Sequence, residues 1–341
     1  MTVLKKFFVL AFCFLLVSGC GLQEQEATAE PESLKEVATN LQIPWSINQV
    51  GNEFYISERV GTIAYVKADG KVEHQKVEFS SPLAKVAEAG LLGFVLTPTF
   101  EETKTAFAYY NYDDGEGPFN RIVTLKLEGN VWKETDIHLD GISTGNVHHG
   151  GRLEIGPDGL LYATIGDAAN PDLAQDPQSK NGKIIRLTAD NQWETVSLGH
   201  RNPQGLAWTE DGELFASEHG QSAHDEINKI EEGQNYGWPL IEGDEEREGL
   251  VTPLLHSGAN DTWAPSGMTF HKGKLYVAAL RGEGILVVNI DTGELEDKIT
   301  GFGRIRDVFS NGEELFFVTN NRDGRGTPAA DDDKLYQLEE K

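Results

Sequence analysis

A repeated pair of short apolar strands constrains the fold of this chain more than any other feature of its sequence. Each copy has an apolar strand, a turn that contains Gly or Asp, and a second apolar strand that ends in polar residues. Alternating apolar residues bounded by such turns are typical of antiparallel meanders. Six copies follow one another along the chain: Trp45–Glu58, Gly90–Tyr112, Gly151–Asp167, Gly205–Glu218, Gly267–Leu280 and Arg306–Asn320.

The spacing of these copies predicts the architecture. They start roughly 40 to 60 residues apart, a period typical of radially repeated β folds. One copy cannot bury both faces of its sheet, so its neighbours must cover them. We therefore predict an all-β fold over residues 34–341, a six-bladed β-propeller with four-stranded antiparallel blades, in which Leu34–Leu41 supplies the outer strand of the last blade. A β-helix or two sandwiches are the alternatives, but neither explains unequal insertions around a constant two-strand core.

The N-terminal residues predict the compartment. Two lysines precede the apolar run Phe7–Val17, and small residues follow it, as in a secretory signal, here residues 1–19. The run is shorter than the about 20 residues that span a bilayer. Cys20 resembles the lipidated cysteine of bacterial lipoproteins, which predicts an extracytoplasmic protein anchored to the cell membrane by lipid; a plain signal peptide is the alternative. Residues 20–33 are polar and acidic, as in a flexible tether.

The charge balance excludes some partners. The chain has 29 basic and 55 acidic residues and a net charge of −26. Nucleic acid requires a basic face, so we expect no nucleic-acid partner. An anionic membrane surface would repel the chain, which leaves the lipid as the only membrane contact. The two cysteines are Cys13 and Cys20, so we predict neither a disulfide nor a cysteine-ligated metal.

One rim of the predicted ring collects charged side chains. In an antiparallel meander the first strand leaves a rim and the second returns to it, so residues just before and just after the pair share one face. We therefore predict a site at one mouth of the central channel. The residues at these positions are Glu58, Arg59, Glu88, His148, His149, Asp167, His200–Asn202, Glu218–Gly220, Ser266, Arg281, Arg304, Arg306 and Asn320–Arg322.

Arg304 and Arg306 indicate the kind of ligand. Residues two apart in an extended strand point to the same face. Two guanidinium groups side by side in an acidic protein suit a small polyanion, because each can bind a carboxylate or phosphate in bidentate fashion. The alternative is a solvent-facing pair, just as Asp167 could be a turn residue.

Several of these stretches resemble the soluble glucose and aldose (sorbosone-type) dehydrogenases that depend on pyrroloquinoline quinone (PQQ). The resemblance covers nearly the whole mature chain in the family's order. It implies oxidation of an aldose sugar to a lactone by hydride transfer from C1 to PQQ, with calcium and an external electron acceptor. The stretches are His148–Asp167, Leu198–Thr209, Asp225–Pro239 and Gly303–Val308, and more weakly Gly90–Phe100 and Ala264–Met268.

The resemblance also implies roles for the predicted site residues. His148 would be the general base, Asp167 the carboxylate that orients it, and Arg201 the cation beside the quinone oxygen. The further cofactor contacts would be Glu88, Asn202, Arg281, Arg304 and Arg306. Glu88 departs from the family's usual glutamine and Arg281 from its usual lysine.

Calcium would have two places by the same resemblance. The carbonyl groups of Gly220 and Gln221 would hold the catalytic ion, and Glu226 with the carbonyl of Tyr236 a structural ion. The chain lacks the long insertions of dimeric glucose dehydrogenases, so we expect a monomer. The rival functions are a non-catalytic binding propeller that has lost PQQ, which Glu88 and Arg281 favour, and a calcium-dependent lactonase.

Overall fold

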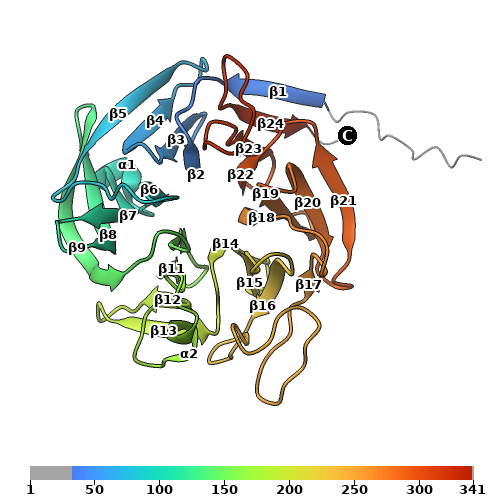
Figure 1. Cartoon of the computed structure of the whole chain (residues 1–341). Coiled ribbons are helices and arrows are strands. Elements are labelled where there is room, and N and C mark those ends of the chain that lie inside the picture. The colour runs from blue at the N-terminus through green and yellow to red at the C-terminus, as the bar shows by residue number, and fades with distance from the viewer. Residues whose placement is uncertain (1–32, 340–341) are drawn as a thin grey trace, which may run out of the picture.

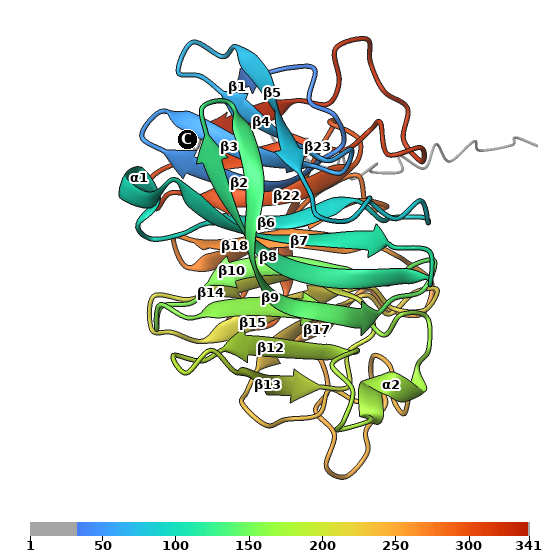
Figure 2. The ribbon, with the colours of Figure 1, turned by 90° about the vertical axis from the view of Figure 1, so that its left-hand side faces the viewer.

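The computed structural model describes residues 33–339, which form 24 β-strands and two four-residue helices, α1 (Phe100–Thr103) and α2 (Asp172–Gln175). The sheets are arranged in a ring, as Figure 1 shows. In the side view of Figure 2 the two helices lie at opposite faces of that ring. The predicted signal segment, Cys20 and nearly all of the predicted tether lie outside the described residues. No helix among residues 33–339 has the length and apolar character needed to cross a membrane.

Four sheets have four strands each, and neighbouring strands are antiparallel. The first contains β10 (Gly150–Ile155), β11 (Leu161–Ile165), β12 (Lys183–Leu187) and β13 (Trp193–Leu198), and the second β14 (Pro203–Trp208), β15 (Leu214–Glu218), β16 (Glu226–Ile230) and β17 (Leu255–His256). The third contains β18 (Pro265–His271), β19 (Lys274–Ala279), β20 (Gly284–Asn289) and β21 (Leu295–Thr300), and the fourth β22 (Ile305–Ser310), β23 (Leu315–Thr319), β24 (Leu335–Glu339) and β1 (Ser33–Ala38).

The fifth sheet has eight strands and consists of two antiparallel halves. A parallel pairing of β5 with β9, from Lys76↔Val131 to Glu78↔Lys133, joins the halves. One half contains β2 (Pro44–Val50), β3 (Glu53–Glu58), β4 (Thr62–Val66) and β5 (Val72–Glu78), and the other β6 (Leu91–Leu96), β7 (Thr105–Asp113), β8 (Pro118–Glu128) and β9 (Val131–Ser143). The prediction of an all-β fold of four-stranded antiparallel sheets is confirmed, and this lateral joining was not predicted.

The repeated strand pairs form the inside of the ring. Each predicted pair becomes the first two strands of a four-strand set, from β2 and β3 to β22 and β23. The first strands contact one another in a closed circuit, from β2 through β6, β10, β14, β18 and β22 back to β2. The predicted N-terminal strand pairs with the last one, with Leu34 opposite Leu338, and so completes the fourth sheet.

The hydrophobic core is divided among the contacts between neighbouring sheets. For example, Phe54 of β3 packs edge-on against Phe316 of β23, with ring centroids 4.9 Å apart, in one cluster that joins the first and last sets. Another cluster joins Phe215 of β15 with Val277 of β19. Each sheet therefore buries its faces against its neighbours, as the repeat requires.

The centre of the ring is filled by a buried ion pair. Arg152 of β10 lies 3.0 Å from Asp307 of β22, and its guanidinium is 4.4 Å from the ring centroid of Trp45. Arg152 also donates a hydrogen bond to the carbonyl of Gln204. Gly267 leaves room for this pair, because a Cβ there would lie 1.6 Å from an Asp307 carboxylate oxygen. The pair thus lies on the channel axis, among the innermost strands.

Candidate functional site

A cavity of about 180 Å³, called the upper cavity below, opens at the rim where the sequence places its charged residues. Loops that enter the first strands and leave the second strands supply its wall. The structure thus brings together eight of the predicted site residues. These are Glu88, His148, Arg201, Asn202, His219, Gly220, Gln221 and Arg281.

His148 is held by the buried carboxylate of Asp167. The His148 Nδ1 lies 2.7 Å from Asp167 Oδ1, and the Asp167 side chain has no exposed surface. The other carboxylate oxygen accepts a hydrogen bond of 2.9 Å from the indole nitrogen of Trp238. Because Asp167 binds Nδ1, the Nε2 of His148 is the ring nitrogen left for a ligand in the cavity. This is the geometry of an oriented base.

The next residue, His149, has a different environment. Its Nδ1 lies 2.5 Å from Thr144 Oγ1 and its Nε2 2.8 Å from the carbonyl oxygen of Ala87. The residue is 2% exposed, and burial lowers its pKa. Both ring nitrogens of His149 bind groups of the protein. His148 is therefore the histidine that can exchange a proton with a substrate.

Arg201 lines the same cavity as His148. Its guanidinium is 5.2 Å from the Trp238 ring centroid, and its Nη1 donates to the carbonyl of His219 at 3.2 Å. Burial lowers the pKa of Arg201, and the negative charges of Asp167 and Glu218 oppose that effect. The Nε of Arg201 is buried without a hydrogen-bond partner. Trp238 therefore supports both the base and the cation.

A buried hydrogen-bond chain fixes the backbone at Arg201. His200 lies between Ser197 Oγ and Glu218 Oε1, each at 2.8 Å, and the other oxygen of Glu218 accepts from the Arg201 amide at 2.7 Å. Asn202 Oδ1 accepts from the amide of Gly150 on the neighbouring sheet at 3.0 Å. Glu218 was predicted at the rim but without a role, and Trp238 was not predicted as a site residue, although it lies in the stretch Asp225–Pro239 that carries the family resemblance.

A deeper cavity continues from the first one and shares Glu88 and His219 with it. Its wall includes Arg59, Arg306 and Arg325. Arg306 donates to Gln204 Oε1 at 2.9 Å, and burial together with the nearby positive charge of Arg59 lowers its pKa to about 9. Two more nitrogen atoms, the Nε of Arg59 and the Nε2 of His219, are buried without a hydrogen-bond partner. This part of the mouth is built from cations.

Arg304 lies on the rim, but its guanidinium is bound by groups of the protein. Asp323 accepts hydrogen bonds from its Nε and Nη2 at 3.0 and 2.7 Å, and the carbonyl of Leu280 accepts one from its Nη1 at 3.0 Å. Arg306, in contrast, does line the deeper cavity. The expectation that both guanidinium groups face the mouth thus holds for Arg306 alone, because the buried carboxylate of Asp323 binds Arg304.

The residues expected to hold calcium occupy two places. Gly220 and Gln221 line the upper cavity, where the amide of Gly220 donates to Asp225 at 2.9 Å. A Cβ at Gly220 would lie 1.9 Å from the carbonyl oxygen of Ala223, so the turn requires glycine. Glu226 and Tyr236 line a small adjoining cavity, which shares Arg201 and Gly220 with the first one, and burial and the charge of Glu218 raise the pKa of Glu226 to about 8.

Side chains alone do not form a metal centre at either place. No group of three or more His, Cys, Asp or Glu side chains within residues 33–339 is arranged to hold a metal ion. A calcium ion here would therefore depend on backbone carbonyl groups, which are among its preferred ligands.

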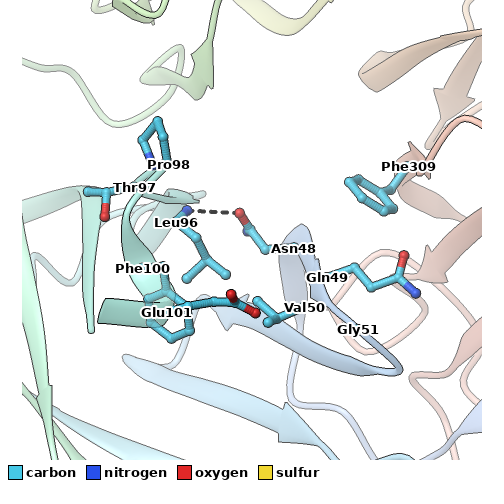
Figure 3. Close-up of a pocket in the computed structure, with 10 residues that line it drawn as sticks. All are labelled: Asn48, Gln49, Val50, Gly51, Leu96, Thr97, Pro98, Phe100, Glu101 and Phe309. Carbon is cyan, nitrogen blue, oxygen red and sulfur yellow. Dashed lines mark hydrogen bonds between the residues drawn. The ribbon is translucent and has the colours of Figure 1, made fainter. Parts of the chain in front are cut away.

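The opposite face of the ring has a wider hollow, of about 440 Å³, shown in Figure 3. It lies at the far ends of β2 and β6, and its wall includes Val50, Leu96, Phe100 and Phe309. Glu101 is the one charged residue in this wall. The wall of this hollow has neither the histidines nor the arginines of the mouth. The smaller cavity at the mouth, and not this larger hollow, is therefore the candidate site.

Comparison with known proteins identifies the family of the chain. Residues 41–327 match the model of the family described as glucose/sorbosone dehydrogenase. The PQQ-bound aldose sugar dehydrogenase of Streptomyces coelicolor is 34% identical, with a TM-score of 0.81 over 90% of this chain and 98% of that one. An aldose sugar dehydrogenase of Escherichia coli is 28% identical over 91% of this chain and 92% of its own length. Quinoprotein glucose dehydrogenase B of Acinetobacter calcoaceticus is 31% identical over 70% of this chain and 59% of its own. The chain belongs to the glucose/sorbosone dehydrogenase family.

Proposed function

We propose that this protein is a PQQ- and calcium-dependent aldose sugar dehydrogenase that oxidises the sugar at C1 to the lactone and passes the electrons to an external acceptor. Counting each half of the eight-stranded sheet as one blade gives the scaffold six blades. The observation that carries the proposal is the position of the His148–Asp167 pair, which faces a cavity whose deeper wall is made of arginines.

The residues of the mouth fit PQQ. Buried donors in folded proteins almost always have an acceptor. Two donors around the mouth, the Nε of Arg59 and the Nε of Arg201, have none. PQQ supplies acceptors of the matching kind, since its carboxylates suit Arg59 and Arg306 and its quinone oxygens suit Arg201. Asn202 and Arg281 would add contacts from the wall of the upper cavity.

The chain's own residues would handle the proton and the charge. The Nε2 of His148 accepts the proton from the C1 hydroxyl of the sugar. Asp167 holds the ring through Nδ1 and stabilises the imidazolium that forms. The Arg201 guanidinium stabilises negative charge that develops on its ligand, in a partly buried place where such an interaction is strong. PQQ, when bound, supplies the quinone that accepts the hydride.

Calcium is part of the same proposal. The carbonyl oxygens of Gly220 and Gln221 would hold the ion beside the cofactor, and Glu226 with the Tyr236 carbonyl a second ion. Burial, together with the charges of Glu218 and Glu242, raises the pKa of Glu226, and a bound cation would offset the repulsion among these carboxylates. Removing calcium with a chelator should abolish PQQ-dependent turnover, and adding it back should restore the rate.

A second candidate is a non-catalytic binding propeller, which Glu88 favours because it places a carboxylate where an anionic cofactor would bind. The third, a calcium-dependent lactonase, has less support, since an arginine-rich mouth suits an anionic cofactor better. We also propose that the protein acts as a monomer, outside the cytoplasm, on a lipid anchor at Cys20. Lipid labelling that a Cys20→Ala variant loses would test the anchor.

One assay tests the main proposal. Purified protein is supplied with PQQ and calcium, and reduction of an artificial electron acceptor is followed with several aldoses. We expect cofactor-dependent reduction with at least one sugar. No reduction, combined with no PQQ binding by titration, would eliminate the dehydrogenase and favour the non-catalytic propeller that has lost PQQ.

A further inference from the structure

Glu88 is the residue of the mouth that the proposed function leaves unexplained. It borders both cavities, between the arginines and the wall that contains His148. Its φ angle is +64°, a left-handed conformation that is unfavourable for a residue other than glycine. A carboxylate in this place should repel an anionic ligand. The mouth therefore needs something that offsets the charge of Glu88.

Arg325 lies in position to offset it. The Nη1 of Arg325 is 2.8 Å from Glu88 Oε1, and the two side chains are 55% and 25% exposed. Burial alone would raise the pKa of Glu88, but the hydrogen bond from Arg325 and the nearby histidines lower it to about 2. Glu88 is consequently ionised at any physiological pH, and Arg325 is its partner.

The loop between β23 and β24 brings Arg325 to this place. Asp323 Oδ1 accepts from the Arg325 amide at 2.9 Å, while Asp323 Oδ2 accepts from the Arg304 side chain at 2.7 Å. The loop also packs closely on Arg304, because a Cβ at Gly326 would lie 2.9 Å from Arg304 Cδ. Arg304 thus acts through Asp323 and anchors the segment that carries Arg325.

We propose that Arg325 is the built-in counter-ion of Glu88, positioned by Arg304 and Asp323, and that this neutralisation sets the affinity of the mouth for its carboxylate-bearing ligand. The inference rests on the proposed function only in taking PQQ as that ligand. It makes Arg325 a positioning residue that acts through Glu88, and it explains why an ionised carboxylate is compatible with an anion site.

A double-mutant cycle tests the proposal. The variants are Arg325→Gln, Glu88→Gln and the double substitution, and the measurement is the Kd for PQQ by fluorescence titration in excess calcium. A second probe, benzene-1,3,5-tricarboxylate, is titrated by calorimetry. Arg186→Gln is the matched control, because Arg186 is also ion-paired but lies on β12 outside the cavities of the mouth.

We expect Arg325→Gln to weaken binding at least about tenfold, because it exposes the ligand to the unpaired charge of Glu88. Glu88→Gln should tighten binding. In the Glu88→Gln background, loss of Arg325 should change Kd by less than about threefold, since no charge remains to be offset. The control should bind like the wild type. If Arg325→Gln proves unstable, Arg325→Lys should bind within about threefold of the wild type, because it keeps the counter-charge.

Three results would overturn the inference: no effect of Arg325→Gln, an equal loss in both backgrounds, or no binding of either probe to the wild type. An equal loss would mean that Arg325 contacts the ligand itself. If the wild type binds the tricarboxylate with the expected cycle but does not bind PQQ, the proposed function fails and the counter-ion role stands.

Discussion

The two halves of the mouth are built in opposite ways. In the half that contains His148, the carboxylate of Asp167 is bound on both oxygens, by His148 and by Trp238. In the half formed by Arg59, Arg201 and Arg306, buried donors are left without acceptors and positive charges lie close together. The first half is complete without a ligand, whereas the second is completed by one. Chemistry that must be in place before substrate arrives is preorganised, and the place that binds an anion keeps its donors free.

The largest effect should come from the preorganised half. His148→Asn removes the base but keeps a residue that tolerates the φ of +64° found there. We expect kcat to fall roughly 100- to 10,000-fold, while the Kd for PQQ stays within about twofold of the wild type. Steady-state kinetics and PQQ titration measure the two quantities separately.

His149→Asn is the matched control, and it should lower stability more than kcat, because His149 bonds to Thr144 and to the Ala87 carbonyl. If it were His149→Asn that abolished turnover at unchanged PQQ affinity, the assignment of the base would be wrong by one residue.

A substitution in the arginine half should change the affinity for PQQ, whereas the substitution of His148 should change kcat. Arg59→Gln removes a cation whose Nε has no partner in the ligand-free protein. We expect the Kd for PQQ to rise about 10- to 100-fold, with little change in the unfolding temperature of the ligand-free protein, because burial of the Arg59 charge and repulsion from Arg325 and Arg304 oppose its attraction to Asp323 and Glu88. Thermal unfolding with and without PQQ gives both values. A drop in ligand-free stability without a change in Kd would make Arg59 a structural residue.

More of the fold than of the site could be predicted from the sequence. The strand pairs, their shared rim and the closing N-terminal strand follow from local patterns, because each depends on residues close together in the chain. The parallel join of β5 to β9 pairs the last residues of β5 with the first three of β9, across a long stretch of sequence that no turn signal spans. In the site, His148, Asp167 and Arg201 lie next to strand ends, where topology alone puts them on the rim.

The residues that were missed lie farther from the strands. Trp238 is in the connection between β16 and β17, and Arg325 is six residues beyond the end of β23, so the path of a loop decides where each side chain lies. Arg304 shows the same limit of prediction from sequence. Its place on the rim was correct, but its partner Asp323 comes from a loop, and that contact turns a predicted ligand contact into an anchor.

The smallest predicted effect tests whether one residue links the two halves. Trp238 donates to Asp167 through Nε1 while its ring lies under the Arg201 guanidinium. Trp238→Phe keeps an aromatic ring and removes the donor, so kcat should fall by up to about tenfold, because only part of the energy of this buried hydrogen bond is lost in the transition state. The Kd for PQQ should change by less than about twofold, because the cation still rests on a ring.

Trp208→Phe is the control for this change, since Trp208 packs edge-on against Tyr162, with centroids 5.0 Å apart, on β14 away from the cavity. It should lower the unfolding temperature without altering kcat. Equal losses of kcat in the two variants would show that Trp238 acts only by packing. A loss of PQQ affinity in Trp238→Phe as large as the loss of kcat would mean that the two halves are coupled through this indole and cannot be treated as separate parts of the mouth.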